Sequence, residues 1–176
     1  EMAAALGLPV HIEIDANLGA LGEWSRGGAA SLTRSGEPGS SVVYVKLATG
    51  VGAGLLFGGE LFTGARGTAG ELGHTVVDPG GAPCACGNRG CLETVVGSGA
   101  VLRRLGLVED GGWEEVLGRL EDPAVVSVLG DAGRALGRVL GSVCNLLDPG
   151  VVIVGGTFAT VGEPLLGPLR EALAAG

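Results

Sequence analysis

Val42-Val-Tyr-Val-Lys-Leu-Ala-Thr-Gly-Val-Gly-Ala-Gly-Leu-Leu-Phe57 contains two β-rich runs, residues 42–47 and 54–57, on either side of Thr49-Gly50-Val51-Gly52. Runs of this kind separated by glycines predict a β-hairpin. The glycines are also able to present backbone N–H groups to a phosphate, but they lack the strand-to-helix setting of known phosphate loops. A hairpin turn is the favoured interpretation, and phosphate binding at Thr49 and Gly50 is the alternative.

Strand and helix patterns alternate on both sides of this hairpin. Residues 10–14 form a short apolar strand candidate, and residues 16–24 follow with apolar positions at helical spacing. Asp15 therefore lies at a strand-to-helix junction. Residues 31–40, rich in Ser, Gly and Pro, predict a loop. Residues 75–77 predict a further short strand.

Helical patterns dominate from Leu92 onward. Residues 125–147 form the longest pattern, and Asp148-Pro149-Gly150 ends it before the fully apolar residues 151–154. Such an apolar run is typical of a central strand in a sheet. The order of elements predicts an α/β domain.

Composition limits the classes of function. The chain has 176 residues, 11 Lys and Arg, and a formal net charge of −8, so this segment does not have the basic surface that phosphate contact requires. No run of about 18 apolar residues and no secretory leader occurs, which favours a cytoplasmic location. The opening Glu1-Met-Ala-Ala-Ala runs directly into a helical pattern, so we expect residues 1–176 to be a fragment of a larger protein.

Three cysteines lie within eight residues, in Cys84-Ala-Cys86-Gly-Asn-Arg-Gly-Cys91, and His74 lies ten residues upstream. Together they predict a Cys3His zinc site, which is structural because a closed set of four ligands leaves no position for water. A disulfide within the cluster and ordinary buried thiols are the alternatives. Three clustered cysteines are an odd number for pairing, and Cys144 belongs to a distant helical pattern typical of a buried thiol.

Three carboxylates are candidates for ligand binding. Asp15 is placed to act as a general base toward a substrate hydroxyl, and its alternative role is the N-cap of a helix. Glu71 and Glu93 flank the predicted metal ligands and are candidates for a shared pocket, although solvated charges at helix ends are the alternative. Ionised carboxylates accept hydrogen bonds from hydroxyl groups, so a carbohydrate ligand fits this set.

Four motifs, in this order, resemble the ROK family of repressors, open reading frames and sugar kinases: Asp15-Ala-Asn-Leu-Gly-Ala-Leu-Gly-Glu23, Lys46-Leu-Ala-Thr-Gly-Val-Gly-Ala-Gly54, Glu71-Leu-Gly-His74 and Cys84-Ala-Cys-Gly-Asn-Arg-Gly-Cys-Leu-Glu93. Val152-Ile-Val-Gly-Gly156 and the helix start that follows it are similar to the adenosine-side motif of that family, so the resemblance covers nearly the whole chain. It implies an actin-like, ribonuclease-H-like α/β fold with a mixed sheet flanked by helices and a zinc loop.

The resemblance also implies roles for individual residues. Zinc would be held by His74, Cys84, Cys86 and Cys91, and a sugar would be bound by Asp15, Glu71, His74 and Glu93, with His74 using one ring nitrogen for each. In the kinases of the family the residue that matches Asp15 is the catalytic base for phosphoryl transfer from ATP with Mg²⁺. A kinase would bind nucleotide through Thr49, Gly50, Gly155 and Gly156.

Departures from the kinase pattern favour the regulators of the family. Ile14 stands where the kinases usually carry Asn, and Thr157 stands where a third glycine is common. Residues 44–54 and 66–74 are most similar to transcriptional regulators of high-GC actinobacteria. We therefore expect residues 1–176 to be the C-terminal sugar-sensing lobe of such a regulator, and a glucokinase-like sugar kinase is the alternative.

The two classes imply different partners. A regulator would contact DNA through a winged helix in an N-terminal region outside this segment, and the family resemblance implies a homo-oligomer. Membrane association is not expected. ATP and Mg²⁺ are expected only for a kinase, and this segment alone, without the N-terminal phosphate loop, should have negligible kinase activity. A zinc hydrolase is disfavoured by the closed ligand set.

Overall fold

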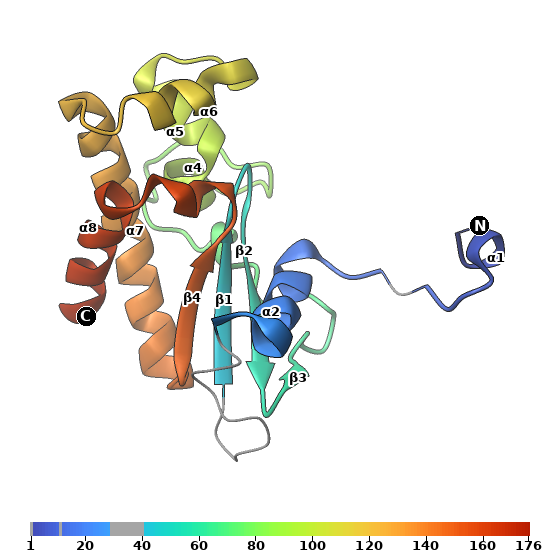
Figure 1. The fold of residues 1–176 in the computed structure, drawn as a ribbon. Helices are drawn as coiled ribbons and strands as arrows, with labels where there is room; N and C mark the ends of the chain where they lie inside the picture. Colours follow the sequence, from blue (N-terminus) through green and yellow to red (C-terminus); the bar gives the residue numbers. More distant parts are fainter. Residues whose placement is uncertain (1, 11, 29–40) are drawn as a thin grey trace.

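The computed structural model describes residues 2–10, 12–28 and 41–176, with the side chains of residues 109–111 excepted (Figure 1). The elements follow one another in the order α1 (Met2–Leu6), α2 (Asp15–Arg26), β1 (Ser41–Leu47), β2 (Val51–Phe57), β3 (Glu60–Leu61), η1 (Leu72–His74), α4 (Glu93–Val96), α5 (Ser98–Leu105), α6 (Glu109–Gly118), α7 (Pro123–Leu147), β4 (Val151–Gly155), η2 (Thr157–Val161) and α8 (Glu163–Ala174).

The sheet is mixed and has the strand order β3-β2-β1-β4. The predicted hairpin is confirmed, because β1 and β2 pair antiparallel from Ser41 opposite Phe57 to Leu47 opposite Val51. Strand β4 pairs with β1 in parallel, and α4 to α7 form the crossover between them. The expected mixed sheet flanked by helices is thus the observed architecture.

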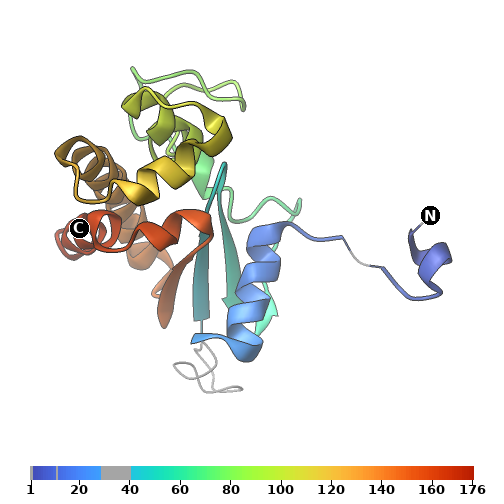
Figure 2. The same ribbon diagram turned by 45° about the horizontal axis from the view of Figure 1, so that its top comes forward.

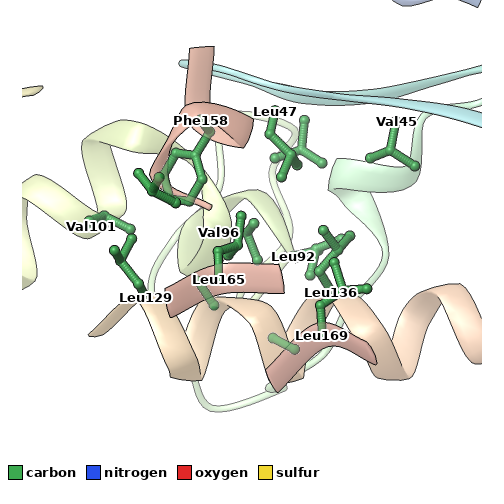
Figure 3. Close-up of a cluster of buried hydrophobic side chains, with 14 of the residues drawn as sticks. Val45, Leu47, Leu92, Val96, Val101, Leu129, Leu136, Phe158, Leu165 and Leu169 are labelled. Carbon is green, nitrogen blue, oxygen red and sulfur yellow. The ribbon is translucent and has the colours of Figure 1, made fainter. Parts of the chain in front are cut away.

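Alternation along β1 sends side chains to two hydrophobic layers, one on each face of the sheet. Val43, Val45 and Leu47 belong to the larger layer, which also contains buried residues of α7 and α8. Figure 3 shows part of this core, where Phe158 of η2 lies with leucines from α7 and α8. Val42 belongs to the smaller layer with Ala20 of α2, so the domain has helices on both faces of the sheet (Figures 1 and 2).

Helix α2 approaches the sheet closely because a strand residue beneath it has no side chain. A Cβ atom at Gly54 of β2 would lie 2.4 Å from the backbone oxygen of Ala16 and 2.7 Å from the Cβ of Ala20. Both alanines are buried. This close packing places Asp15, the first residue of α2, against the end of β1 that carries Lys46.

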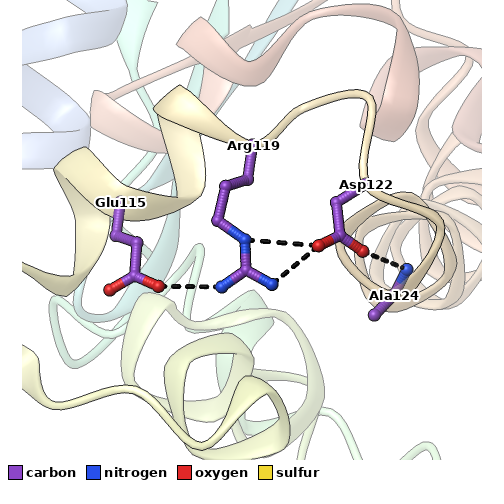
Figure 4. Close-up of polar contacts among 4 residues, drawn as sticks. All are labelled: Glu115, Arg119, Asp122 and Ala124. Carbon is purple, nitrogen blue, oxygen red and sulfur yellow. Dashed lines mark hydrogen bonds and ion pairs between the residues drawn. The ribbon is translucent and has the colours of Figure 1, made fainter.

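Helix α7 has well-defined ends. The Asp122 carboxylate accepts a hydrogen bond from the Ala124 N–H at 2.8 Å as the N-cap, and Pro123 occupies the first turn. Arg119 donates to the same carboxylate and also to Glu115, which holds the cap in place (Figure 4). At the other end Asp148 adopts a left-handed conformation with φ of 44° and stops the helix.

Three local expectations are wrong. Residues 10 and 12–14 form no strand, because the segment leads away from the sheet and has no partner strand in the described part of the chain; Ile12 is 92% exposed. The expected strand at residues 75–77 is a single bridge between Val76 and Cys91. Among the described strands, β4 lies at the edge rather than the centre of the sheet. An apolar strand sequence indicates that both faces of the strand are covered. It does not indicate whether the strand has a neighbouring strand on each side.

The predicted loop at residues 31–40 lies outside the part of the chain that the structure describes. None of the helices formed by the described residues is both long enough and apolar enough to cross a lipid bilayer.

Candidate metal centre and adjoining pocket

The structure brings the four predicted metal ligands together. One ligand atom from each of His74, Cys84, Cys86 and Cys91 lies within 4.8 Å of all the others. The Cys86 and Cys91 Sγ atoms are 3.6 Å apart, and the Cys84 Sγ lies 3.5 Å from His74 Nδ1. Bonds of about 2.3 Å to sulfur and 2.0–2.1 Å to nitrogen in a tetrahedron require separations close to these. The residues therefore fit Zn²⁺.

The two alternative interpretations of the cysteines do not fit this geometry. All four cysteines are free thiols, and the Cys86–Cys91 separation far exceeds a disulfide bond of about 2.05 Å. Cys86 is exposed, so it is not an ordinary buried thiol. Cys144 lies in α7 outside the cluster, as expected, but it is half-buried rather than fully buried.

Tight turns shape the cysteine loop. The Cys84 N–H donates to Asn88 O, and the Gly87 N–H donates back to Cys84 O. Gly90 has φ of 64°, and a Cβ atom there would lie 1.4 Å from Asp78 O. Gly90 O accepts from the N–H groups of both Val77 and Asp78, so the backbone crosses here at a distance that only glycine permits.

The thiols differ in their electrostatic surroundings. Burial, followed by the hydrogen bond with Cys86, raises the pKa of the Cys91 thiol to about 12. The backbone N–H of Asn88 lowers the pKa of Cys86. A divalent cation would convert both to thiolates, because a coordinating thiol gives up its proton to the metal.

His74 faces two environments at once. Its Nδ1 is directed at Cys84, and its Nε2 lies 3.7 Å from the Glu71 Oε2. Residue 74 ends the η1 turn, in which the His74 N–H donates to Glu71 O. One imidazole thus connects the cysteine cluster to the neighbouring cavity.

That cavity has a volume of about 350 Å³ and gathers all four residues predicted to bind sugar, namely Asp15, Glu71, His74 and Glu93. They come from the start of α2, the η1 turn and the start of α4. Glycines of β2 and of the turn before it form part of the wall. A cavity lined by several carboxylates suits a ligand rich in hydroxyl groups.

The structure distinguishes between the two roles considered for Asp15. The N-cap position of α2 belongs to Ile14, and no side chain caps the helix. Asp15 is instead the first helical residue, and its carboxylate accepts a hydrogen bond from the Lys46 ammonium. Its side chain is 70% exposed toward the cavity.

Glu93 is not a freely solvated charge. Its Oε2 accepts a hydrogen bond from the Val51 N–H at 3.2 Å, in a partly buried setting. A Cβ at Gly50 would lie 3.0 Å from the same oxygen, so the turn of the hairpin packs against this carboxylate. Glu93 therefore joins α4 to the hairpin at the edge of the cavity.

A second cavity of about 340 Å³ adjoins the first through Thr49. It lies beyond the carboxyl ends of β1 and β4 and includes Thr157, Phe158 and Trp113 in its lining. The Phe158 and Trp113 rings pack with centroids 4.6 Å apart, and the buried Trp113 Nε1–H has no partner in the described part of the chain. The crevice outside the carboxyl ends of parallel strands is a common position for ligands in α/β sheets.

The glycines predicted to bind nucleotide have structural tasks in β4. A Cβ at Gly155 would lie 2.4 Å from the Tyr44 hydroxyl oxygen, and a Cβ at Gly156 would lie 2.2 Å from Leu47 O. Gly156 has φ of 88°. Both residues allow β4 to lie close to β1, and a nucleotide role for Thr49, Gly50, Gly155 and Gly156 stays a prediction.

Sequence reasoning gave no role to Lys46, which lines the main cavity. A signal was present, because Lys46 is the only lysine among the 11 basic residues of the chain. Its significance is visible only once the fold sets it beside Asp15.

Comparison with known proteins agrees with this geometry. The family model described as "ROK family" matches residues 1–175. The chain belongs to the ROK family. Its relatives within the family include a xylose repressor of Bacillus subtilis, 32% identical over 93% of this chain and 42% of the repressor. They also include a glucokinase of Thermotoga maritima, 35% identical over 97% of this chain and 57% of the glucokinase.

Solved ROK structures give the same result for the fold. A ROK family transcriptional regulator described as a homologue of E. coli MLC superposes with a TM-score of 0.82 at 29% identity, over 99% of this chain and 46% of that one. A ROK family glucokinase from Streptomyces griseus, in complex with glucose and AMPPNP, superposes with a TM-score of 0.79 at 31% identity, over 98% of this chain and 60% of that one. The fold is therefore the actin-like ATPase fold of ROK sugar kinases.

The chain spans about half the length of the curated relatives that it matches. Repressors and glucokinases occur side by side among them, so family membership alone does not separate a regulator from a kinase.

Proposed function

We propose that residues 1–176 are the sugar-sensing effector lobe of a ROK-family transcriptional regulator, with Zn²⁺ held by His74, Cys84, Cys86 and Cys91. The observation that carries this proposal is the convergence of Asp15, Glu71, His74 and Glu93 on one cavity beside the Cys3His cluster. Carboxylates there would accept hydrogen bonds from sugar hydroxyls, and a zinc ion held by the cluster would fix the orientation of the His74 ring.

Two departures from the kinase pattern favour a sensor over a kinase. Ile14 stands where the kinases of the family usually carry Asn, and Thr157 stands where a third glycine is common.

Signalling would proceed through domain orientation. Sugar bound at Glu71, His74 and Glu93 biases the arrangement of this lobe relative to the rest of the parent protein and to a second subunit. Operator contact belongs to a winged helix outside these residues, because a net charge of −8 opposes binding of DNA by this segment.

A sugar kinase is the second candidate, and the cavity beside Thr49 favours it. Thr49 and Thr157 both line this cavity of about 340 Å³, and Thr49 also lines the proposed sugar pocket. In a kinase it would receive the nucleotide, Mg²⁺ would accompany the phosphates, and Asp15 would be the catalytic base.

The two candidates are separated by measurements on the full-length parent protein. We expect calorimetry to detect binding of D-glucose or D-xylose, and coupled assays with ATP and Mg²⁺ to detect no phosphorylation of either sugar. Asp15→Asn should weaken sugar binding by about tenfold, since a charged hydrogen bond becomes a neutral one.

Other results would contradict the proposal in different ways. Phosphorylation that is present in the natural protein and abolished in Asp15→Asn would identify a kinase. If protein with a full metal content and a cooperative thermal transition binds neither sugar, the proposal that this lobe senses a sugar is wrong.

A further inference from the structure

Lys46 is unusual in this chain, because every other basic residue among the 11 is an arginine. It occupies the end of β1 that faces the proposed sugar cavity, and its side chain is 29% exposed. Among the described residues that line this cavity it is the one lysine or arginine, set among the carboxylates of Asp15, Glu71 and Glu93.

The register of the sheet sets Lys46 between two glycines. Its register partners are Gly52 on β2 and Gly155 on β4, so neither neighbouring strand places a side chain beside it. The ammonium donates to the Asp15 carboxylate, which is its single partner in the described part of the chain. The pair therefore sits in the mouth of the cavity with one donor and one acceptor group side by side.

The hydrogen-bonding properties of sugar hydroxyls suit the Lys46–Asp15 pair. Each sugar hydroxyl is both a donor and an acceptor, whereas ionised Glu71, Glu93 and Asp15 only accept. Lys46 has three N–H donors, and Asp15 takes one of them. Two donors are left for a ligand, beside the second oxygen of Asp15.

We propose that Lys46, with Asp15, recognises two adjacent hydroxyls of a neutral sugar, one accepting from the Lys46 ammonium and one donating to the Asp15 carboxylate. This inference rests on the proposed sugar-binding function and deepens it, since it names a vicinal diol as the group that is recognised. Lys46 is thus a residue that determines specificity, and it also holds Asp15 in position.

Lysine suits this position better than arginine. An ammonium is a compact charge with donors in three directions, whereas a guanidinium is a rigid planar fork that matches a carboxylate with two parallel bonds. An arginine would engage both oxygens of Asp15 with two parallel bonds, so fewer of its donors and fewer of the carboxylate lone pairs would remain for a diol.

The test uses Lys46→Met, Lys46→Arg and Asp15→Asn in the full-length parent protein, with calorimetry against D-glucose, D-xylose and their monodeoxy derivatives. Lys46→Met, which keeps the length and removes the charge, should weaken binding by about tenfold or more. Lys46→Arg should also bind more weakly than the natural protein. The double variant with Asp15→Asn should lose less than the product of the two single losses, because the two residues serve one diol.

Deoxy sugars provide a readout that a merely structural role would not change. Loss of a contacted hydroxyl should weaken binding to the natural protein by about tenfold and should have little further effect on Lys46→Met. Metal content and thermal unfolding, equal in the natural protein and the variants, would show that the fold is intact.

Two outcomes overturn the inference and are distinguishable from each other. Sugar binding that is equally tight in the natural protein and in Lys46→Met would overturn the role of Lys46 and leave the proposed function in place. Absence of binding of both sugars to the natural protein would overturn the proposed function, and the role of Lys46 with it.

Discussion

At the scale of single residues, Gly90 sets the path of the cysteine loop. Gly90 has a positive φ of 64°, and Gly87 also has a positive φ, of 94°, but the surroundings of the two glycines differ. A Cβ at Gly90 meets Asp78 O at 1.4 Å, whereas a Cβ at Gly87 has no atom within 4 Å. We expect Gly90→Ala to lose bound zinc and to unfold at lower temperature, because the backbone crossing must open.

Gly87→Ala is the matched control for this prediction. It has the strain of a left-handed backbone, of about 1–2 kcal/mol, without the steric clash. Metal content by elemental analysis and melting by circular dichroism are the measurements. Equal zinc content and equal melting temperatures in the two variants would show that close approach at Gly90 is not what shapes the loop.

At the scale of elements, the start of α7 depends on the Asp122 carboxylate. Hydrogen bonds from Arg119, and then from the Ala124 N–H, lower the pKa of this carboxyl below its ordinary value of 3.8 (Figure 4). A lowered pKa in the folded state means that the cap stabilises the protein above about pH 4 and that this contribution is lost as the pH falls through the lowered value. The Asp122→Asn variant should therefore have a lower melting temperature than the natural protein at pH 7. The difference between the two melting temperatures should become smaller below pH 4.

Thermal melts of the two proteins between pH 7 and pH 3 test this expectation. Asp148→Asn, at the opposite end of α7, is a suitable control, since Asp148 acts through its left-handed backbone, which asparagine also tolerates. A melting difference for Asp122→Asn that stays constant down to pH 3 would count against a charged cap.

At the scale of the whole molecule, the proposed metal site and the proposed sugar pocket share His74. We expect removal of zinc by a chelator to lower both the melting temperature and the sugar affinity of the parent protein, because His74 and Glu71 lose their support. Cys86→Ser should contain less than one zinc ion per chain, whereas Cys144→Ser, outside the cluster, should retain the ion. If zinc-free protein binds sugar as tightly as the natural protein, sugar binding does not depend on the metal site, which would contradict this expectation.

The spacing of residues along the chain was sufficient to predict much of the site. Cys84, Cys86 and Cys91 lie within one short loop, so local turns bring them together, and their ligand chemistry is visible in the sequence. The hairpin and the long helix α7 were predicted for the same reason, since alternation and helical periodicity are local properties. Asp15, Glu71 and Glu93 were candidates from their positions beside a strand end and the predicted metal ligands, and the ROK motifs imply the same residues.

Only the tertiary structure decided what depends on distant partners. The segment before Asp15 is apolar enough for a strand, but strand formation requires a neighbour, and none lies beside it among the described residues. The edge position of β4 likewise depends on which strands are adjacent. Lys46 and Asp15 are 31 positions apart, and they meet because Gly54 lets α2 approach the sheet. Sequence alone thus determined the chemistry that is available, and packing decided which groups meet, because contacts between distant residues exist only after the layers have formed.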